Sequence, residues 1–159
     1  MKSHNTPTLS GIAHYLSGYA DGEGCFSVSF SHRPKLTVGW EVKPSFAVGQ
    51  NADRAEVLAL MQRYFKCGFI RANRADKTVK YEVRSIEDLV TKVLVHFAKY
   101  PLRSSKQKDV KLLTQICVAM KTRQHLNANG LKRIINLAYQ MNGSGKRKYT
   151  KDEILSHLR

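Results

Sequence analysis

The hydrophobic period of the chain changes within residues 16–30, LSGYADGEGCFSVSF. Upstream, apolar residues recur at helical spacing behind a Thr-Pro pair that suits a helix start, so we expect a helix over residues 7–21. Downstream, residues 25–33 alternate between polar and apolar, which is typical of a half-buried strand. An Asp-Gly-Glu-Gly sequence, residues 21–24, lies at the join. A helix is therefore expected to pass into a strand through an acidic turn.

The rest of the chain continues with strand-like and helix-like segments. Further strands are expected over residues 40–48, 69–74 and 78–84, and further helices from Asp53 to Gly68, from Ser85 to Pro101, and over 105–122, 130–141 and 151–158. Asp53 with Glu56 and Thr150 with Glu153 resemble capping boxes, Ser85 suits an N-cap, and Gly68 and Pro101 suit helix ends. Residues 143–149 are expected to form a flexible linker to the short last helix.

This order of elements, αββαββα with extra C-terminal helices, predicts an α+β fold. Its four strands are expected to form one antiparallel sheet with helices on one face. A chain of 159 residues is long enough for one hydrophobic core and short for two, so we expect a single domain over residues 1–159.

The charge of the chain indicates a polyanionic partner. Lys and Arg number 27 against 12 Asp and Glu, a formal net charge of +15 spread along the sequence, which favours nucleic acid. The three cysteines form no Cys-x-x-Cys pair and the histidines show no metal-binding spacing, so any metal site is expected to be made of oxygen atoms. The absence of an apolar span or secretion signal predicts an intracellular protein with no membrane partner.

One face of the predicted sheet is polar. Its residues, with Lys35 from the loop after the first strand, are Ser27, Ser29, Ser31, Arg33, Lys35, Glu41, Lys43, Arg71, Asn73, Lys80, Glu82 and Arg84. An exposed polar face is ordinary for an antiparallel sheet. Because this one is net positive and rich in hydrogen-bonding groups, we expect it to bind double-stranded DNA, with Arg71 and Arg84 as the best candidates for paired contacts to guanine.

The segment LSGYADGEG, residues 16–24, resembles the nine-residue signature of the LAGLIDADG homing endonucleases. It matches at Leu16, Gly18, Asp21 and Gly24, and Glu23 is a conservative equivalent of the second acid. The αββαββα order agrees with that family over almost the whole chain. The resemblance implies a site-specific, metal-dependent DNA endonuclease whose signature helices pack together across a twofold or pseudo-twofold axis.

The resemblance also implies roles for individual residues. Glu23 would bind the catalytic Mg²⁺, or another divalent ion such as Mn²⁺, with the Gly22 carbonyl as a second ligand, whereas Asp21 would support the helix end. By position, Gln50, Arg54 and Lys106 would complete the catalytic site, with Lys108 as the alternative lysine. Ser10, Ala13, Ser17 and Ala20 form a stripe of small residues, and Ala13, Ser17, Gly18 and Asp21 are expected at the helix interface.

Only one such motif is found, which implies a homodimer acting on a long, roughly palindromic target. An RNA maturase that binds intron RNA is the main alternative, and a non-catalytic DNA-binding regulator on the same scaffold is the second. A ribosomal-type basic protein would explain the charge but not the acidic turn. The resemblance implies an intron-encoded protein made where it acts, in a chloroplast, a mitochondrion or the bacterial cytoplasm.

Overall fold

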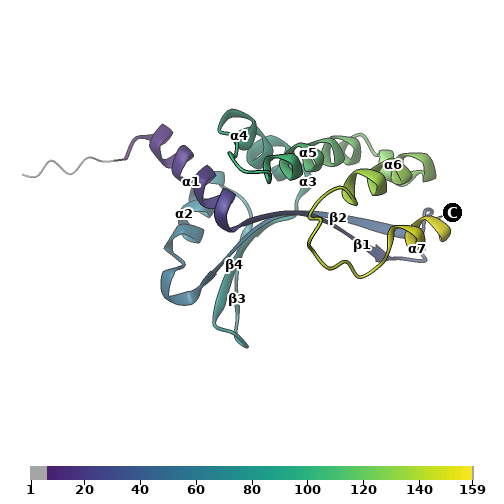
Figure 1. Cartoon of the computed structure of the whole chain (residues 1–159), viewed down its shortest axis with the longest axis horizontal. Coiled ribbons are helices and arrows are strands. Elements are labelled where there is room, and N and C mark those ends of the chain that lie inside the picture. The colour runs from purple at the N-terminus through teal and green to yellow at the C-terminus, as the bar shows by residue number, and fades with distance from the viewer. Residues whose placement is uncertain (1–6, 159) are drawn as a thin grey trace, which may run out of the picture.

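The computed structural model describes residues 7–158, whose strands form one antiparallel sheet in the order β1-β2-β4-β3. The strands are β1 (Gly24–His32), β2 (Trp40–Asn51), β3 (Phe69–Asn73) and β4 (Thr78–Val83). Helices α1, α4, α5 and α6 lie on one side of this sheet (Figure 1). The predicted α+β fold, with a four-stranded antiparallel sheet, is confirmed.

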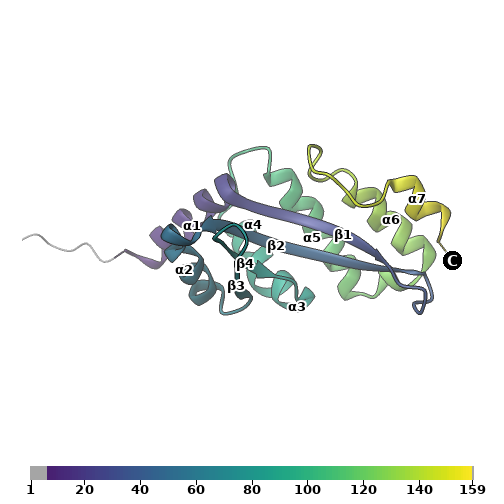
Figure 2. The same ribbon diagram turned by 90° about the horizontal axis from the view of Figure 1, so that it is seen from below.

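The helices follow the predicted order along the chain (Figure 2). They are α1 (Leu9–Glu23), α2 (Glu56–Phe65), α3 (Ile86–Asp88), α4 (Leu94–Lys99), α5 (Gln107–Lys121), α6 (Ala128–Ala138) and α7 (Lys151–Ser156). A π-helical turn over Leu89–Val93 joins α3 to α4, and short 3₁₀ turns span Ala52–Arg54 and Gln124–Leu126. No helix in residues 7–158 is long and apolar enough to cross a membrane.

The alternation of the strands places their apolar side chains under the helices. Phe26 on β1 and Phe46 on β2 are directly paired in register, fully buried, with ring centroids 4.9 Å apart. Phe97 of α4 packs edge-on against both rings, at 5.2 and 5.4 Å. Because replacing a buried phenylalanine by alanine typically costs about 3–5 kcal/mol, this cluster holds α4 firmly on the sheet.

Two predicted helix boundaries are corrected. Helix α1 begins at Leu9, because the hydroxyl of Thr8 accepts the Gly11 N–H at 3.0 Å and caps it. Thr6, the expected cap, lies outside the described residues. In α2 the expected Asp53–Glu56 capping box is absent, since Ala52–Arg54 forms a 3₁₀ turn and the N-cap is Ala55.

The C-terminal end of α2 also differs from the prediction. Lys66, at φ 53°, takes the left-handed cap position that we expected of a glycine. Gly68 has a different role, because a Cβ there would lie 2.7 Å from the Tyr81 ring and 2.8 Å from the Glu82 carbonyl. It allows β3 to start close against β4. The predicted Ser85 cap and the Thr150–Glu153 capping box are confirmed.

Candidate active site and nucleic-acid interface

Helix α1 passes into β1 without a loop. Glu23 is the last residue of the helix and Gly24 the first of the strand, and the Gly24 N–H donates to the Ala20 carbonyl. A Cβ on Gly24 would lie 2.5 Å from that carbonyl oxygen, so glycine is required for this direct junction. The exposed carboxylate of Glu23 is thereby fixed at one end of the sheet.

Three of the four predicted catalytic residues line one hollow beside this junction. Its volume is about 460 Å³, and its lining residues are Glu23, Gly49, Gln50, Asn51, Arg54, Thr78, Val79 and Lys80. Gln50 comes from the end of β2 and Arg54 from the 3₁₀ turn that follows. A carboxylate, two amides and two cationic side chains therefore surround one hollow.

Lys106, the fourth predicted catalytic residue, lies at the C-terminal end of α1. Its Nζ donates to the Gly22 carbonyl at 3.3 Å and to the Ala20 carbonyl at 3.4 Å. A cation is favourable there because the last carbonyls of a helix carry partial negative charge. The contact distinguishes Lys106 from Lys108, which is exposed on α5. Lys106 is not among the residues that line the hollow.

Asp21 fastens the segment that carries Lys106 to the end of α1. One carboxylate oxygen accepts the N–H groups of Arg103 at 2.8 Å and Ser104 at 3.0 Å, and the other accepts the Ser104 hydroxyl. Partial burial raises the pKa of Asp21, but the hydrogen bonds from Ser104 and Arg103 outweigh it and hold the pKa below its usual value. The carboxylate is therefore fully engaged within its own chain.

Asp21→Asn is expected to lower the free energy of unfolding by about 1–2 kcal/mol, because the side chain loses the charge that strengthens the bonds from the Arg103 and Ser104 N–H groups, and an amide nitrogen cannot accept the Ser104 hydroxyl. Because the pKa of Asp21 is lower in the folded chain than in the unfolded chain, its carboxylate stabilises the fold at pH values above the unfolded-state pKa. That stabilisation is lost as the pH falls through the folded-state pKa. In urea unfolding, the difference in unfolding free energy between the wild type and Asp21→Asn should therefore be smaller at about pH 2 than at pH 7. The matched control, Asp53→Asn on an exposed carboxylate, should stay within about 0.5 kcal/mol. An equal loss for both variants would contradict this role.

The strand register places the predicted polar residues on the sheet face away from the helices. Ser27 pairs with Ser45, Ser29 with Lys43 and Ser31 with Glu41 across β1 and β2. Arg71 pairs with Lys80 across β3 and β4, and Asn73 pairs with Thr78. Arg33 and Lys35 lie in the loop after β1, where Arg33 is 2.9 Å from Glu41. Sequence reasoning missed Cys25 and Ser45, although their parity places them on this face.

Glu82 is the centre of an ionic cluster on this face. It is only 3% exposed, and its oxygens lie 3.0 Å from Arg84, 3.4 Å from Arg71 and 3.5 Å from Lys80. Ser45 donates its hydroxyl at 2.9 Å. Burial raises the pKa of Glu82, but the Ser45 hydroxyl and the cations outweigh it and lower the pKa. The expected direct DNA contact of Glu82 is therefore corrected, because its carboxylate is covered.

The two arginines of this cluster also share one aromatic ring. The guanidinium carbons of Arg71 and Arg84 lie 5.6 and 5.7 Å from the centroid of Phe69, a residue 38% exposed on the same face. Cation–π contact and the shared carboxylate restrict both side chains. Both remain more than half exposed, so their remaining donors face solvent.

The expected helix-interface residues divide into two sides of α1. Ala13 and Ser17 are 0% and 5% exposed within the chain itself. The Ser17 hydroxyl donates to the Tyr100 carbonyl at 2.6 Å and lies 3.0 Å from Nε2 of the buried His96. Their predicted position at an interface is corrected, since they form part of the chain's own core. Helix α1 has small residues on two sides, one with Ala13 and Ser17 and one with Gly18. The spacing of its apolar residues does not say which of these two sides faces the core.

The outward side of α1 carries Gly11, Tyr15, Gly18 and Gly22. A Cβ added at Gly18 or Gly22 would meet no atom within 4 Å. Packing within residues 7–158 therefore does not require glycine at either position. Tyr15 is 52% exposed beside them.

The donors near Glu23 are oxygen atoms. They include its own carboxylate, the Gly22 carbonyl and the Gln50 side-chain oxygen, which are the hard ligands that Mg²⁺ and Mn²⁺ prefer. Within residues 7–158, no group of three or more His, Cys, Asp or Glu side chains is placed to hold a metal ion. A divalent ion beside Glu23 thus fits the chemistry of the donors that one chain offers.

Comparison with known proteins identifies one family. The family model described as LAGLIDADG endonuclease matches residues 16–117. A "Probable intron-encoded endonuclease 2" of Neurospora crassa is 31% identical over 142 residues, covering 88% of this chain and 31% of that protein's length. The chain thus spans less than a third of that relative.

Solved structures are similar over nearly the whole chain. The I-LtrWI LAGLIDADG homing endonuclease bound to target DNA has a TM-score of 0.86 and 30% identity, covering 92% of this chain and 49% of that one. The archaeal intron-encoded homing endonuclease I-Vdi141I, complexed with DNA, has a TM-score of 0.84 and 29% identity, covering 91% of this chain and 92% of that one. The similarity therefore extends over about nine tenths of this chain in both cases.

Proposed function

Because the chain belongs to the LAGLIDADG family of homing endonucleases, we propose that it is a site-specific DNA endonuclease that cleaves both strands by metal-dependent hydrolysis. The observation that carries this proposal is the position of Glu23 beside Gln50 and Arg54, at a hollow on the end of the polar sheet. An acid that no cation neutralises would repel DNA phosphates. Its place there has a clear purpose if it holds a metal ion.

Glu23, the Gly22 carbonyl and water would hold Mg²⁺ or Mn²⁺. When bound, the ion supplies positive charge at the scissile phosphate and lowers the pKa of a bound water. Lys106 holds the Gly22 carbonyl at the end of α1 and adds positive charge there. Arg54 and Lys80, which line the same hollow, would bind the phosphate, and the Gln50 amide would orient water.

The outward side of α1 supports a pairing of two signature helices. Gly18 and Gly22 leave the helix backbone open to close approach, and Tyr15 offers exposed apolar area beside them. One motif provides one acid, so two copies of the chain would bring two Glu23 side chains to a common axis. We propose a homodimer, which would read a long, pseudo-palindromic target.

The polar sheet face is proposed to read the DNA sequence. I-LtrWI and I-Vdi141I, which share this fold, have been solved with DNA. Arg71 and Arg84 have free donors and restricted positions, which suits paired hydrogen bonds to guanine in the major groove. Glu82 is proposed to set the direction of both arginines and not to contact a base.

Arg71→Ala or Arg84→Ala is expected to remove roughly 1–3 kcal/mol of discrimination at one base position in each half-site. Glu82→Gln should relax the preference at the same positions, because it loosens both guanidinium groups together. Selection from a randomised target library measures each preference. Arg33→Ala, at the opposite end of the sheet face, is the control and should alter a different position. Unchanged base preferences for Arg71→Ala, Arg84→Ala and Glu82→Gln would show that this cluster does not read sequence.

The activity itself is tested by incubating the protein with DNA that carries candidate intron-insertion sites. We expect both strands to be cut with Mg²⁺ or Mn²⁺ and neither strand with a chelator. Specific DNA binding without cutting would support the regulator, and rescue of intron splicing without cutting would support the maturase.

The relatives also suggest where the protein is made. The Neurospora crassa relative is named as intron-encoded, and another similar protein, of Podospora anserina, is named for its place in an ND4 intron. We propose that this chain is likewise encoded by an intron and made in the organelle or bacterial cytoplasm that holds the intron. Intron RNA is a proposed second partner.

A further inference from the structure

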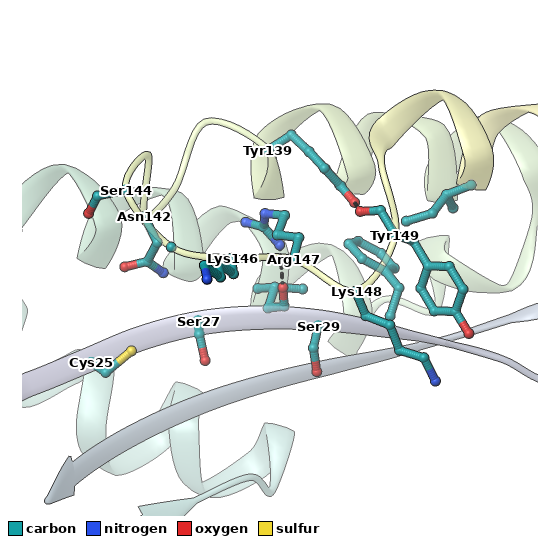
Figure 3. A pocket seen from close by; sticks show the side chains of 14 residues that line it. Cys25, Ser27, Ser29, Tyr139, Asn142, Ser144, Lys146, Arg147, Lys148 and Tyr149 are labelled. Carbon is teal, nitrogen blue, oxygen red and sulfur yellow. Dashed lines mark hydrogen bonds between the residues drawn. The ribbon is translucent and has the colours of Figure 1, made fainter.

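Residues 142–149, here called the strap, lie along the outer edge of β1. This strand is the first in the sheet order, so one side of its backbone has no neighbouring strand. Asn142 donates its side-chain amide to the Phe26 carbonyl at 2.6 Å. Arg147 donates to the Val28 carbonyl at 2.8 Å (Figure 3). The segment expected to be a linker thus satisfies edge carbonyls of β1.

Arg147 holds the strap with both of its terminal nitrogens. Its other terminal nitrogen donates to the carbonyls of Ala138 and Met141. Its guanidinium carbon lies 4.4 Å from the centroid of the Tyr139 ring. Both terminal nitrogens of this arginine are therefore bonded within its own chain, although it stands in the most basic run of the strap, Lys146-Arg147-Lys148.

The two flanking lysines make fewer contacts than Arg147, and the Lys148 Nζ lies 5.2 Å from the centroid of the Tyr149 ring. Because Arg147 turns toward the sheet, Lys146 and Lys148 are both exposed, and neither has an ion-pair partner among residues 7–158. They line a hollow of about 340 Å³ together with Ser27 and Ser29 of the polar sheet face. Figure 3 shows that Lys148 extends toward the side of β1 on which Ser29 points.

We propose that the strap is a phosphate-binding margin of the DNA interface, with Lys146 and Lys148 contacting the backbone of duplex DNA beside β1. The inference rests on the proposed function and extends it to a segment outside the sheet. A lysine is a compact charge with no planar fork, which suits phosphates and not base edges. The contact therefore adds affinity without sequence preference, whereas Arg147 serves only to fix the two lysines at the sheet margin.

The experiment compares the double variant K146Q/K148Q with K111Q/K132Q, which removes the same charge from exposed positions on α5 and α6 across the sheet. Binding of the full chain to a cognate duplex and to a scrambled duplex is measured at several salt concentrations. Each lost phosphate contact reduces the slope of log affinity against log salt by about 0.9, so K146Q/K148Q should reduce it by about 1.8 on both duplexes. The control should keep the wild-type slope.

The possible failures are distinguishable. A wild-type slope for K146Q/K148Q, with salt-dependent binding by the wild type, would overturn the strap proposal and leave the endonuclease proposal standing. A wild-type chain that binds neither duplex would overturn both. A loss confined to the cognate duplex would mean that the lysines read bases. A loss for a structured RNA of equal length, without one for DNA, would assign the strap to RNA.

Discussion

Glu23→Gln is expected to abolish cleavage while leaving DNA binding about as tight as in the wild type. Glutamine keeps the length and hydrogen-bonding capacity of the side chain but lacks the charge that would hold a divalent ion. Loss of transition-state charge stabilisation of this kind typically lowers kcat by about 10²–10³-fold or more. Without metal, binding should improve, because a carboxylate near phosphates is repulsive when no cation neutralises it.

Electrophoretic binding and Mg²⁺-dependent cutting of the same DNA give the two measurements. The matched control is Glu56→Gln, which removes an exposed carboxylate from the first turn of α2, outside the hollow. It should cut at the wild-type rate. If Glu23→Gln also cut at that rate, the acid at the helix–strand junction would not hold the metal, and the endonuclease proposal would give way to the maturase or the regulator.

Gly18→Leu is expected to separate the subunits without unfolding them. A Cβ at this position meets no other part of its own chain within 4 Å, and leucine is a better helix former than glycine by about 0.5–1 kcal/mol. The same side chain would lie between two paired helices and force them apart, at a cost of about 1–3 kcal/mol per copy. Since each copy supplies one Glu23, cleavage should fall with dimerisation.

Sedimentation, thermal unfolding and cutting together distinguish the two sides of α1. Ala13→Leu is the control, because Ala13 is fully buried and overpacking there should lower the melting temperature of each chain. A wild type that sediments as a monomer and still cuts both strands would contradict the dimer. So would a Gly18→Leu variant that remains dimeric and fully active.

The sequence predicts those features that depend on neighbouring residues. The alternation after Gly24 predicts which β1 side chains are buried, and the acid placed between glycines marks Glu23. The sequence does not predict that Glu82 is the buried centre of an ionic cluster, because Ser45, whose hydroxyl donates to Glu82, is 37 residues away. Arg147 likewise binds a carbonyl 119 residues away, and a run of Gly, Ser and Lys contains no sign of that contact.

The uninterrupted passage from α1 into β1 leaves no hinge between the acid and the strand beside it. Because Gly24 also closes a backbone hydrogen bond to Ala20, the two elements move together. Under the proposed function, the protein backbone then fixes how many base pairs separate the bases that are read from the bond that is cut. New side chains on the sheet should redirect the enzyme to new targets without moving the cut. One residue inserted between Glu23 and Gly24 should instead displace the acid relative to the strand and so move the cut.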